Sequence, residues 1–167
     1  MSNVPSSMAN WAIRVAMALA VLASVPSVAA AQIESRLGTW DLDVDRSTFS
    51  PGPPPRQQTL TYSAAGKQWT ALLQGVDASG KPINPDVNNL SISFDGREHP
   101  TATVDYETTA WQRVDARKYL VIRKKAGKVV LTSTNVLSPD GKTMTITTIG
   151  KNAAGQSIHN VRVYLKR

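Results

Sequence analysis

The earliest strand-like pattern in the sequence is Gly38–Val44, where apolar and polar positions alternate without interruption. The apolar positions are Trp40, Leu42 and Val44, and the polar positions are Thr39, Asp41 and Asp43. In an extended strand this alternation places apolar side chains on one face and polar side chains on the other. Gly38 lets the chain enter a sheet at an angle that other residues resist, and it leaves room for the Trp40 indole. We therefore predict a half-buried antiparallel strand in which Gly38 and Trp40 have structural roles.

Short segments of strand-forming residues recur along the rest of the chain. They are Gln58–Tyr62, Gln68–Leu73, Leu90–Phe94, Tyr119–Ile122, Val129–Leu131, Met144–Ile146 and Val161–Leu165. Glycines that suit tight hairpin turns stand between them, namely Gly66, Gly80, Gly96, Gly127, Gly141 and Gly155. No segment shows a sustained helical period. The pattern predicts an all-β fold, an up-and-down antiparallel β-barrel of about 8 to 10 strands, because closure of the sheet removes exposed edges.

Two irregular segments interrupt this pattern. Phe49–Pro55 contains four prolines, so it can be neither a helix nor an inner strand, and we predict a stiff loop. The loop could cover one mouth of the barrel, but a plain connector that protects the first edge strand is the favoured interpretation. Lys81–Asn89 is long and polar and is a candidate for a second flap.

The first part of the chain has the features of a secretory signal peptide. Arg14 is the only charged residue before the apolar run Val15–Val25, and Val28–Ala31 supplies a cleavage site of small residues. A membrane-spanning helix needs about 20 apolar residues, so an uncleaved anchor is the less favoured alternative. We predict that residues 1–31 are removed and that residues 32–167 form a single β-barrel domain. This domain is expected to be exported to a bacterial periplasm or secreted.

Charge and cysteine content limit the partners of the predicted domain. It carries a formal net charge of +6, because the whole chain has +7 and the leader contains one arginine. The absence of cysteine excludes disulfides and a lipid-attachment cysteine. Export argues against nucleic acid as a partner, so anionic envelope components or an acidic small ligand are better candidates. The charge could also serve solubility alone, and we expect a monomer that does not span the membrane.

The two ends of the predicted barrel, Gly38–Leu42 and Val161–Lys166, resemble the first and last strands of the calycin barrels, which include the lipocalins and the fatty-acid-binding proteins. The resemblance implies a closed barrel whose Trp40 seals one end beneath a basic residue of a late strand, either Arg162 or Lys166. It also implies an interior that holds one small apolar ligand. Fatty-acid-binding proteins have a helix-turn-helix lid after the first strand, which the proline-rich loop forbids here. The chain also resembles small exported bacterial barrels with a G-T-W first strand and repeated D-G-K turns.

Arg162 and Tyr164 are the predicted ligand anchors. In the fatty-acid-binding proteins an Arg-x-Tyr pair on the last strand faces inward and grips a carboxylate, and the resemblance implies the same here. Alternation alone favours the opposite orientation, in which Val161, Val163 and Leu165 fill the interior. A guanidinium that faces inward without a partner costs several kcal/mol. The inward orientation therefore requires an anionic ligand or an internal carboxylate, for which Asp105 and Glu107 are candidates.

Aromatic residues supply the other predicted ligand contacts, namely Trp69 and Phe94. With Trp111 and Tyr119, Trp69 is expected to be a core or mouth aromatic rather than part of a platform for stacking sugars. These side chains lie in or next to predicted strands.

Signatures of metal binding are weak. The residues Asp41, Asp43 and Asp45 are spaced like the start of a calcium loop, but Arg46 and Gly52 stand where that loop needs Gly and Glu. His99 and His159 are far apart in the sequence, and no cysteine is present. We predict no metal and no cofactor.

Signatures of catalysis are equally weak. The chain has no G-x-S-x-G elbow and no cysteine nucleophile. Asp95, Glu98 and His99 could do acid-base chemistry, but they lie on a predicted turn, where such residues usually serve turn formation. We predict that the protein is not an enzyme.

Six basic residues gather near two predicted strands, and they define the second functional hypothesis. They are Arg117, Lys118, Arg123, Lys124, Lys125 and Lys128. Such a run could bind anionic lipid or polysaccharide, although it more often discourages pairing at a sheet edge.

The favoured hypothesis is an exported, non-catalytic barrel that binds a small hydrophobic or amphipathic ligand, such as a lipid or fatty acid. The alternative is an envelope interaction or structural module with a packed core and a basic surface.

Overall fold

The computed structural model describes residues 35–65, 68–83, 89–101 and 103–167 of the chain. The predicted signal peptide lies outside these residues, as does most of the second predicted flap. Within the described part, no helix is long and apolar enough to cross a membrane.

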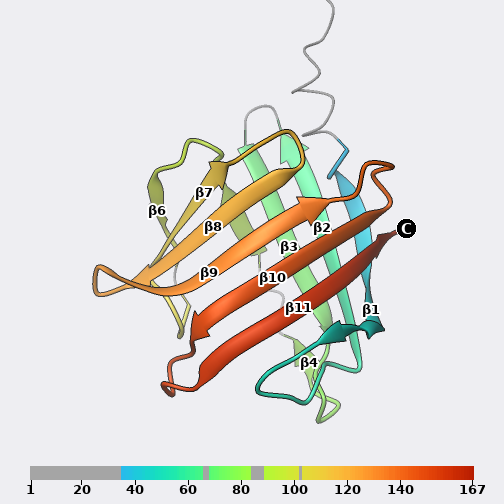
Figure 1. Cartoon of the computed structure of the whole chain (residues 1–167), viewed down its shortest axis with the longest axis horizontal. Helices are drawn as coiled ribbons and strands as arrows, with labels where there is room; N and C mark the ends of the chain where they lie inside the picture. The colour runs from blue at the N-terminus through green and yellow to red at the C-terminus, as the bar shows by residue number, and fades with distance from the viewer. Residues whose placement is uncertain (1–34, 66–67, 84–88, 102) are drawn as a thin grey trace, which may run out of the picture.

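Eleven β-strands make up the described structure (Figure 1). They are β1 (Gly38–Thr48), β2 (Gln57–Ala65), β3 (Gln68–Val76), β4 (Pro82–Ile83), β5 (Asn89–Ile92), β6 (Glu98–Pro100), β7 (Thr108–Arg113), β8 (Lys118–Lys125), β9 (Lys128–Leu137), β10 (Thr143–Lys151) and β11 (Ser157–Lys166). The predicted all-β, up-and-down antiparallel fold is confirmed. Three short strands, β4, β5 and β6, bring the number above the predicted range.

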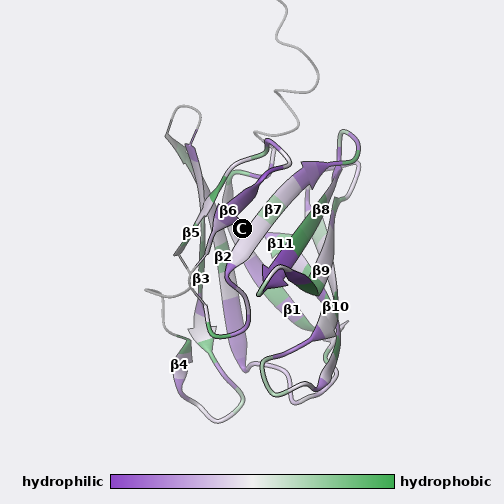
Figure 2. Ribbon diagram, turned by 90° about the vertical axis from the view of Figure 1, so that its left-hand side faces the viewer, coloured by the Kyte–Doolittle hydropathy of each residue, from purple (hydrophilic) through white to green (hydrophobic). Residues whose placement is uncertain are grey.

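A single antiparallel sheet contains all these strands, in the order β4-β3-β2-β1-β11-β10-β9-β8-β7-β6, with β5 paired to β3. The strand that begins the fold therefore pairs with the strand that ends it, and Trp40 lies opposite Lys166. The sheet curls so that β2 and β3 face β8, β9 and β10 across an interior (Figure 2). Among the described residues, the ladder of paired strands ends at β6 on one side and at β4 and β5 on the other.

The interior face of the sheet carries the large buried side chains. Trp40 and Tyr164 are fully buried, and Met144 next to them on β10 is buried as well. The other members of the core cluster are Leu60, Tyr62, Trp69, Ala71, Ile92, Trp111, Tyr119, Val121, Leu137 and Ile146. Alternation along each strand brings these residues to one face, and the curl of the sheet makes that face the inside.

Two glycines within strands allow neighbouring backbones to approach closely. A Cβ atom added at Gly75 would lie 2.1 Å from the carbonyl oxygen of Gln57, and one at Gly150 would lie 2.0 Å from that of Val130. Both glycines have a positive φ, of 154° and 141°. Glycine is therefore required at both positions. Neither was among the turn glycines expected from the sequence.

Candidate functional site

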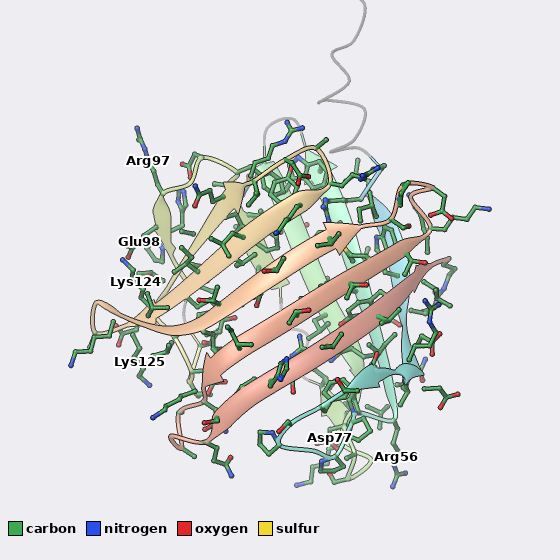
Figure 3. All side chains as sticks on the ribbon, in the orientation of Figure 1. Arg56, Asp77, Arg97, Glu98, Lys124 and Lys125 are labelled. Carbon is green, nitrogen blue, oxygen red and sulfur yellow. The ribbon has the colours of Figure 1, made fainter. Side chains whose placement is uncertain are left out.

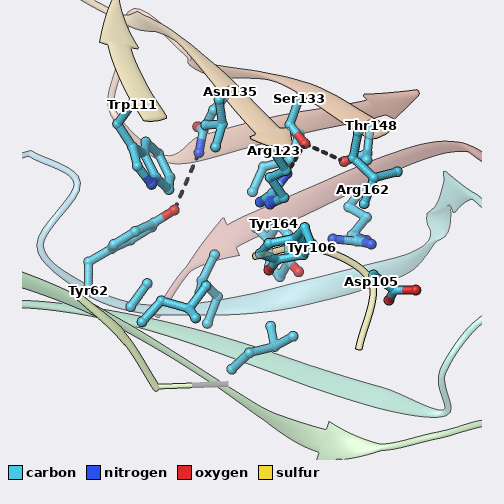
Figure 4. A pocket seen from close by; sticks show the side chains of 17 residues that line it. Tyr62, Asp105, Tyr106, Trp111, Arg123, Ser133, Asn135, Thr148, Arg162 and Tyr164 are labelled. Carbon is cyan, nitrogen blue, oxygen red and sulfur yellow. Dashed lines mark hydrogen bonds between the residues drawn. The ribbon is translucent and has the colours of Figure 1, made fainter. Parts of the chain in front are cut away.

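A cavity of about 270 Å³ lies inside the barrel (Figure 4). Its apolar lining comes from Leu60, Ala71, Leu73, Leu90, Trp111, Val121, Leu131 and Ile146. Its polar lining comes from Tyr62, Asp105, Tyr106, Arg123, Ser133, Asn135, Thr148, Arg162 and Tyr164. The lining is thus about half polar, so the cavity suits a small ligand that has polar as well as apolar groups.

Arg162 and Tyr164 both line this cavity, from the last strand. The orientation that alternation alone favoured, with the valines of β11 inside, is therefore wrong. The register explains the difference, because Arg162 lies opposite Ile146 and Tyr164 opposite Met144, and both partners belong to the inner face. A register shift between β1 and β11 accompanies this arrangement: Asp43 pairs with Val163, but Thr48 pairs with Val161.

Arg123 also points into the cavity, and sequence reasoning assigned it to a surface run. Its Nη1 donates a hydrogen bond of 2.7 Å to Ser133 Oγ, which is 2.9 Å from Thr148 Oγ1. The guanidinium lies over the ring of Tyr106, 5.2 Å from its centroid. Burial lowers the pKa of Arg123, and the nearby charge of Arg162 lowers it further. The signal in the sequence was that Val121 and Arg123 share one face of a strand.

Neither arginine of the cavity has a carboxylate partner. Among the described residues no carboxylate oxygen lies within 4.0 Å of Arg123 or Arg162, and the Nε atom of each is buried without a hydrogen bond. Asp105 lines the cavity, but its Oδ1 accepts the backbone N–H of Ala153 at 2.9 Å. Glu107 instead accepts the N–H of Ala126. The two carboxylates considered from the sequence therefore form no ion pair with Arg162.

Tyr164 has a hydrogen-bond partner inside the protein. Its hydroxyl donates a bond of 2.6 Å to Gln58 Oε1. Burial raises the pKa of Tyr164 to about 12, against a smaller lowering by the positive charge of Arg162. The hydroxyl is therefore neutral at ordinary pH and acts as a donor.

The opposite end of the cavity holds a second polar group. Asn135 Nδ2 donates to the hydroxyl oxygen of Tyr62 at 3.3 Å, and Asn135 Oδ1 accepts from Nη1 of Arg36 at 2.8 Å. Arg36 itself is 3% exposed and also donates to the carbonyl of Arg117. Its guanidinium lies 4.7 Å from the ring centroid of Tyr119. Burial lowers the pKa of Arg36.

Trp69 and Phe94, the other predicted ligand contacts, lie in an aromatic cluster beside the cavity. Phe94 packs edge-on against Trp69 and Trp111, with centroid distances of 5.4 and 5.8 Å, and lies 4.9 Å from Tyr119. Of these four rings, only Trp111 lines the cavity. The cluster is a wall behind the site rather than part of its lining.

Trp40 and Gly38 lie where β1 begins. The Trp40 indole is fully buried and donates from Nε1 to the carbonyl of Arg36 at 2.8 Å. Lys166, not Arg162, is the basic residue above it, with Nζ 5.3 Å from the ring centroid. Gly38 has a φ of 109°, a conformation that favours glycine.

The proline-rich loop follows β1 and lies beside Arg162. Phe49, Pro53 and Pro55 line a surface hollow that also includes Arg162. The loop is fastened to β11, because Ser50 N–H donates to Asn160 Oδ1 at 2.9 Å. Arg162 therefore belongs both to the inner cavity and to the hollow at this end of the barrel.

The fold divides the basic run. Lys118 lies at the start of β8 and Lys125 at its end, and Arg123 faces inward. Lys124 forms an ion pair with Glu98 (Figure 3). Both side chains are partly exposed, so the pair contributes little to stability. Lys125 Nζ donates to the carbonyl of Val104 at 2.7 Å. The six residues therefore do not form one continuous patch.

The clusters considered for metal or acid-base chemistry are surface features. His99 Nε2 lies 3.0 Å from both carboxylate oxygens of Asp95, and both side chains are 42% exposed. Asp41 is paired with Arg167, which lowers the pKa of that carboxyl. Among the described residues no group of three or more His, Cys, Asp or Glu is placed to hold a metal.

The sheet order, in which the first strand pairs with the last, gives an antiparallel β-barrel with an internal cavity, a fold like that of the fatty-acid-binding proteins. No protein-family model matches the sequence, and no curated protein matches it. A solved structure that does match is that of zebrafish ileal bile acid-binding protein in complex with cholic acid. The TM-score is 0.50 at 13% sequence identity, over 80% of this chain and 99% of the other. At this identity the likeness supports the fold.

Proposed function

We propose that this protein is an exported, non-catalytic carrier that binds one small amphipathic anion inside its barrel. The acidic group of the ligand lies against Arg162 and Arg123, and its apolar part fills the remainder of the cavity. Export rests on the signal-like residues 1–31, and the nearer kinship with exported bacterial barrels rests on the sequence resemblance alone.

One observation carries this proposal: two guanidiniums line the cavity and neither has a carboxylate within 4.0 Å among the described residues. Burying an arginine without a counter-charge costs several kcal/mol. A bound anion would offset that cost by accepting charge-assisted hydrogen bonds, each of which contributes about 1.5 to 3 kcal/mol. The bile acid-binding neighbour supports a barrel interior as a place for an amphipathic acid.

The size of the cavity limits the ligand. A water molecule occupies about 30 Å³ of the liquid, so about 270 Å³ holds about nine waters or a similar number of non-hydrogen atoms. Ligand sites for drug-sized molecules start at about 300 Å³. A medium-chain acid fits this space, whereas a longer chain must displace side chains or extend through the hollow next to Arg162.

A calorimetric titration with octanoate and octylamine tests the proposal, because the two probes share an apolar tail and differ in the sign of their charge. Octanoate is expected to bind and octylamine is not. Arg162→Met should weaken octanoate binding at least about tenfold, which corresponds to about 1.4 kcal/mol. Arg97→Met, which removes the same charge from an exposed turn, should leave binding unchanged. Equal binding of both probes, or no binding of either, would contradict the proposal.

Native mass spectrometry of protein purified from its own cells, followed by lipid extraction, would identify the natural ligand. Repeated recovery of an empty barrel would count against a carrier.

The alternative function, an envelope module that uses a basic surface, has less support because the basic run is divided and Lys124 is already paired with Glu98. Charge reversal of Lys124, Lys125 and Lys128 tests that alternative, which predicts loss of binding to anionic envelope fractions.

A further inference from the structure

The hydroxyl group of Tyr62 lines the cavity, and within the described part of the chain it is a hydrogen-bond donor without an acceptor. Tyr62 is 4% exposed and belongs to β2. Its only hydrogen bond among the described residues is the one that its oxygen accepts from Asn135 Nδ2. A phenolic hydroxyl can donate one hydrogen bond in addition to those it accepts. The donor of Tyr62 is therefore uncommitted.

Arg36 decides the direction of this hydrogen bond. A guanidinium has donors and no acceptor, so the atom of Asn135 that lies 2.8 Å from Arg36 Nη1 must be the carbonyl Oδ1. The amide nitrogen of Asn135 is then the atom turned toward Tyr62. Since an amide nitrogen only donates, the Tyr62 oxygen must accept. The usual ambiguity between the oxygen and nitrogen of an asparagine amide is thus removed by its charged neighbour.

This chain of donors ends at the cavity. Arg36 donates to Asn135, Asn135 donates to Tyr62, and the Tyr62 hydroxyl has no acceptor among residues 35–65, 68–83, 89–101 and 103–167. Successive hydrogen bonds in one direction polarise each other in a medium of low dielectric constant, which strengthens the last donor. A buried donor that makes no hydrogen bond costs about 1 to 3 kcal/mol of stability. An acceptor on a bound ligand would recover that cost.

Figure 4 shows Tyr62 and Asn135 at one end of the cavity and Arg162 at the other, with Arg123 and Tyr164 between them. The strand register agrees, because Tyr62 lies opposite Gly38 and Tyr164 opposite Leu42, four positions further along β1. Four positions correspond to about 13 Å along a strand. Tyr62 and Arg162 therefore lie at opposite ends of the cavity.

We propose that the ligand carries a hydrogen-bond acceptor, such as a ketone, ether or hydroxyl oxygen, at the end opposite its acidic group, and that Tyr62 donates to this acceptor. The inference rests on the proposed function and names its ligand class as an oxygenated medium-chain acid rather than a plain fatty acid. Tyr62 is then a specificity-determining residue, and Asn135 and Arg36 are positioning residues. A site built to hydrogen-bond a polar group discriminates against analogues without that group.

The test compares octanoate with a series of oxo-octanoates whose ketone stands at different carbons. A ketone only accepts, so it reports on a donor. At least one member of the series should bind about threefold to tenfold more tightly than octanoate, the range expected for one net hydrogen bond. Tyr62→Phe should abolish this preference, so that the variant binds octanoate and the oxo-octanoates equally well. Tyr119→Phe is the matched control, because that hydroxyl is buried without a partner and does not line the cavity.

A second variant separates hydrogen-bond direction from shape. In Asn135→Asp both side-chain oxygens accept, so one faces Arg36 and the other accepts from Tyr62, which uses up the free donor. The ketone preference should disappear although Tyr62 is still present. Unfolding of each variant by denaturant confirms that it is folded before it is titrated.

The outcomes distinguish this inference from the proposed function. If no acid binds at all, the proposed function fails. If octanoate and every oxo-octanoate bind equally well, or if the ketone preference survives both Tyr62→Phe and Asn135→Asp, the carrier function stands and the role of Tyr62 is overturned.

Discussion

The hydroxyl of Tyr164 and the side-chain carbonyl of Gln58 are joined by a hydrogen bond of 2.6 Å. Both residues are buried, and they come from β11 and β2, the two strands that flank β1 in the sheet. The bond therefore links both neighbours of the first strand through side chains on the inner face. It joins β11 to β2 independently of the backbone hydrogen bonds that each of these strands makes with β1.

Removal of this hydroxyl should lower stability. Tyr164→Phe leaves Gln58 Oε1 buried without a donor, which is expected to cost about 1 to 3 kcal/mol in the free energy of unfolding. Urea denaturation of the two proteins measures the difference. Tyr119→Phe, which removes a buried hydroxyl that makes no hydrogen bond to the described residues, should change stability by less than about 1 kcal/mol. Equal effects of the two substitutions would show that the bond to Gln58 contributes nothing.

Stability is expected to fall at alkaline pH. Burial raises the pKa of Tyr164 to about 12 in the folded state, from an ordinary value of 10.0. The folded state therefore binds this proton more tightly than the unfolded state. The resulting stability is fully present below pH 10 and is lost progressively as pH rises toward about 12, by up to about 3 kcal/mol. Tyr62, whose pKa is also raised by burial, adds to the loss.

Denaturation curves at about pH 8 and about pH 11 measure this loss. Tyr164→Phe should show a smaller decrease between the two pH values than the parent chain. A decrease of the same size in both proteins would place the alkaline instability elsewhere.

Arg36 should stabilise the barrel although it is a buried charge. Arg36→Met removes the donor that satisfies Asn135 Oδ1, whereas the carbonyl of Arg117 still accepts from the backbone N–H of Leu137. Relief of the desolvation of the guanidinium offsets part of this cost, and we expect a net loss of about 1 to 3 kcal/mol. Urea denaturation of the two proteins measures the difference, and equal stability would show that Arg36 does not stabilise this end of the barrel.

Removal of Arg123 should raise the stability of the unliganded protein, whereas removal of Arg36 should lower it. Its Nη1 donates to Ser133, and Ser133 keeps Thr148 as a partner when Arg123 is removed. Arg123→Met therefore leaves Ser133 satisfied and removes a desolvated charge. The unliganded protein should gain about 1 to 3 kcal/mol of stability and bind octanoate more weakly. A loss of stability would contradict the view that this arginine is kept for a ligand.

Gly150 should not tolerate a side chain. In Gly150→Ala the new Cβ would lie 2.0 Å from the Val130 carbonyl oxygen, so the two strands must separate. We expect a loss of more than about 3 kcal/mol, or a chain that fails to fold. Gly141→Ala is the control, because Gly141 also has a positive φ, of 70°, but open space around it, and it should cost about 1 kcal/mol. Similar losses for both would show that backbone conformation alone, without the close approach, makes glycine necessary.

Much of the fold could be predicted from local patterns. Alternation at Gly38–Val44 located the first strand, and glycines such as Gly127 and Gly141 marked the hairpin turns, because period-two burial and positive φ are properties of a few neighbouring residues. The Arg-x-Tyr pair at Arg162 and Tyr164 brought the last strand into the candidate site through a family resemblance. Each of these signals is visible within about ten residues of sequence.

The remaining features depend on residues far apart in the chain. Alternation on β11 is satisfied by either orientation, and only pairing with the inner residues of β10 turned Arg162 and Tyr164 inward. Arg123 stands within a run of basic residues, so its inward position depends on the strand register rather than on its neighbours in the sequence.

The sequence by itself determined the all-β class, the turns and the first strand, since local sterics and solvation of adjacent residues control these. Only the tertiary structure decided that Arg36 contacts Asn135 across 99 positions and that Gly150 meets the backbone of a neighbouring strand. It also decided that the free hydroxyl of Tyr62 opens into the cavity. The physical reason is that hydrogen-bond direction and uncompensated charge depend on all the groups around an atom, and those groups come together only when the sheet curls.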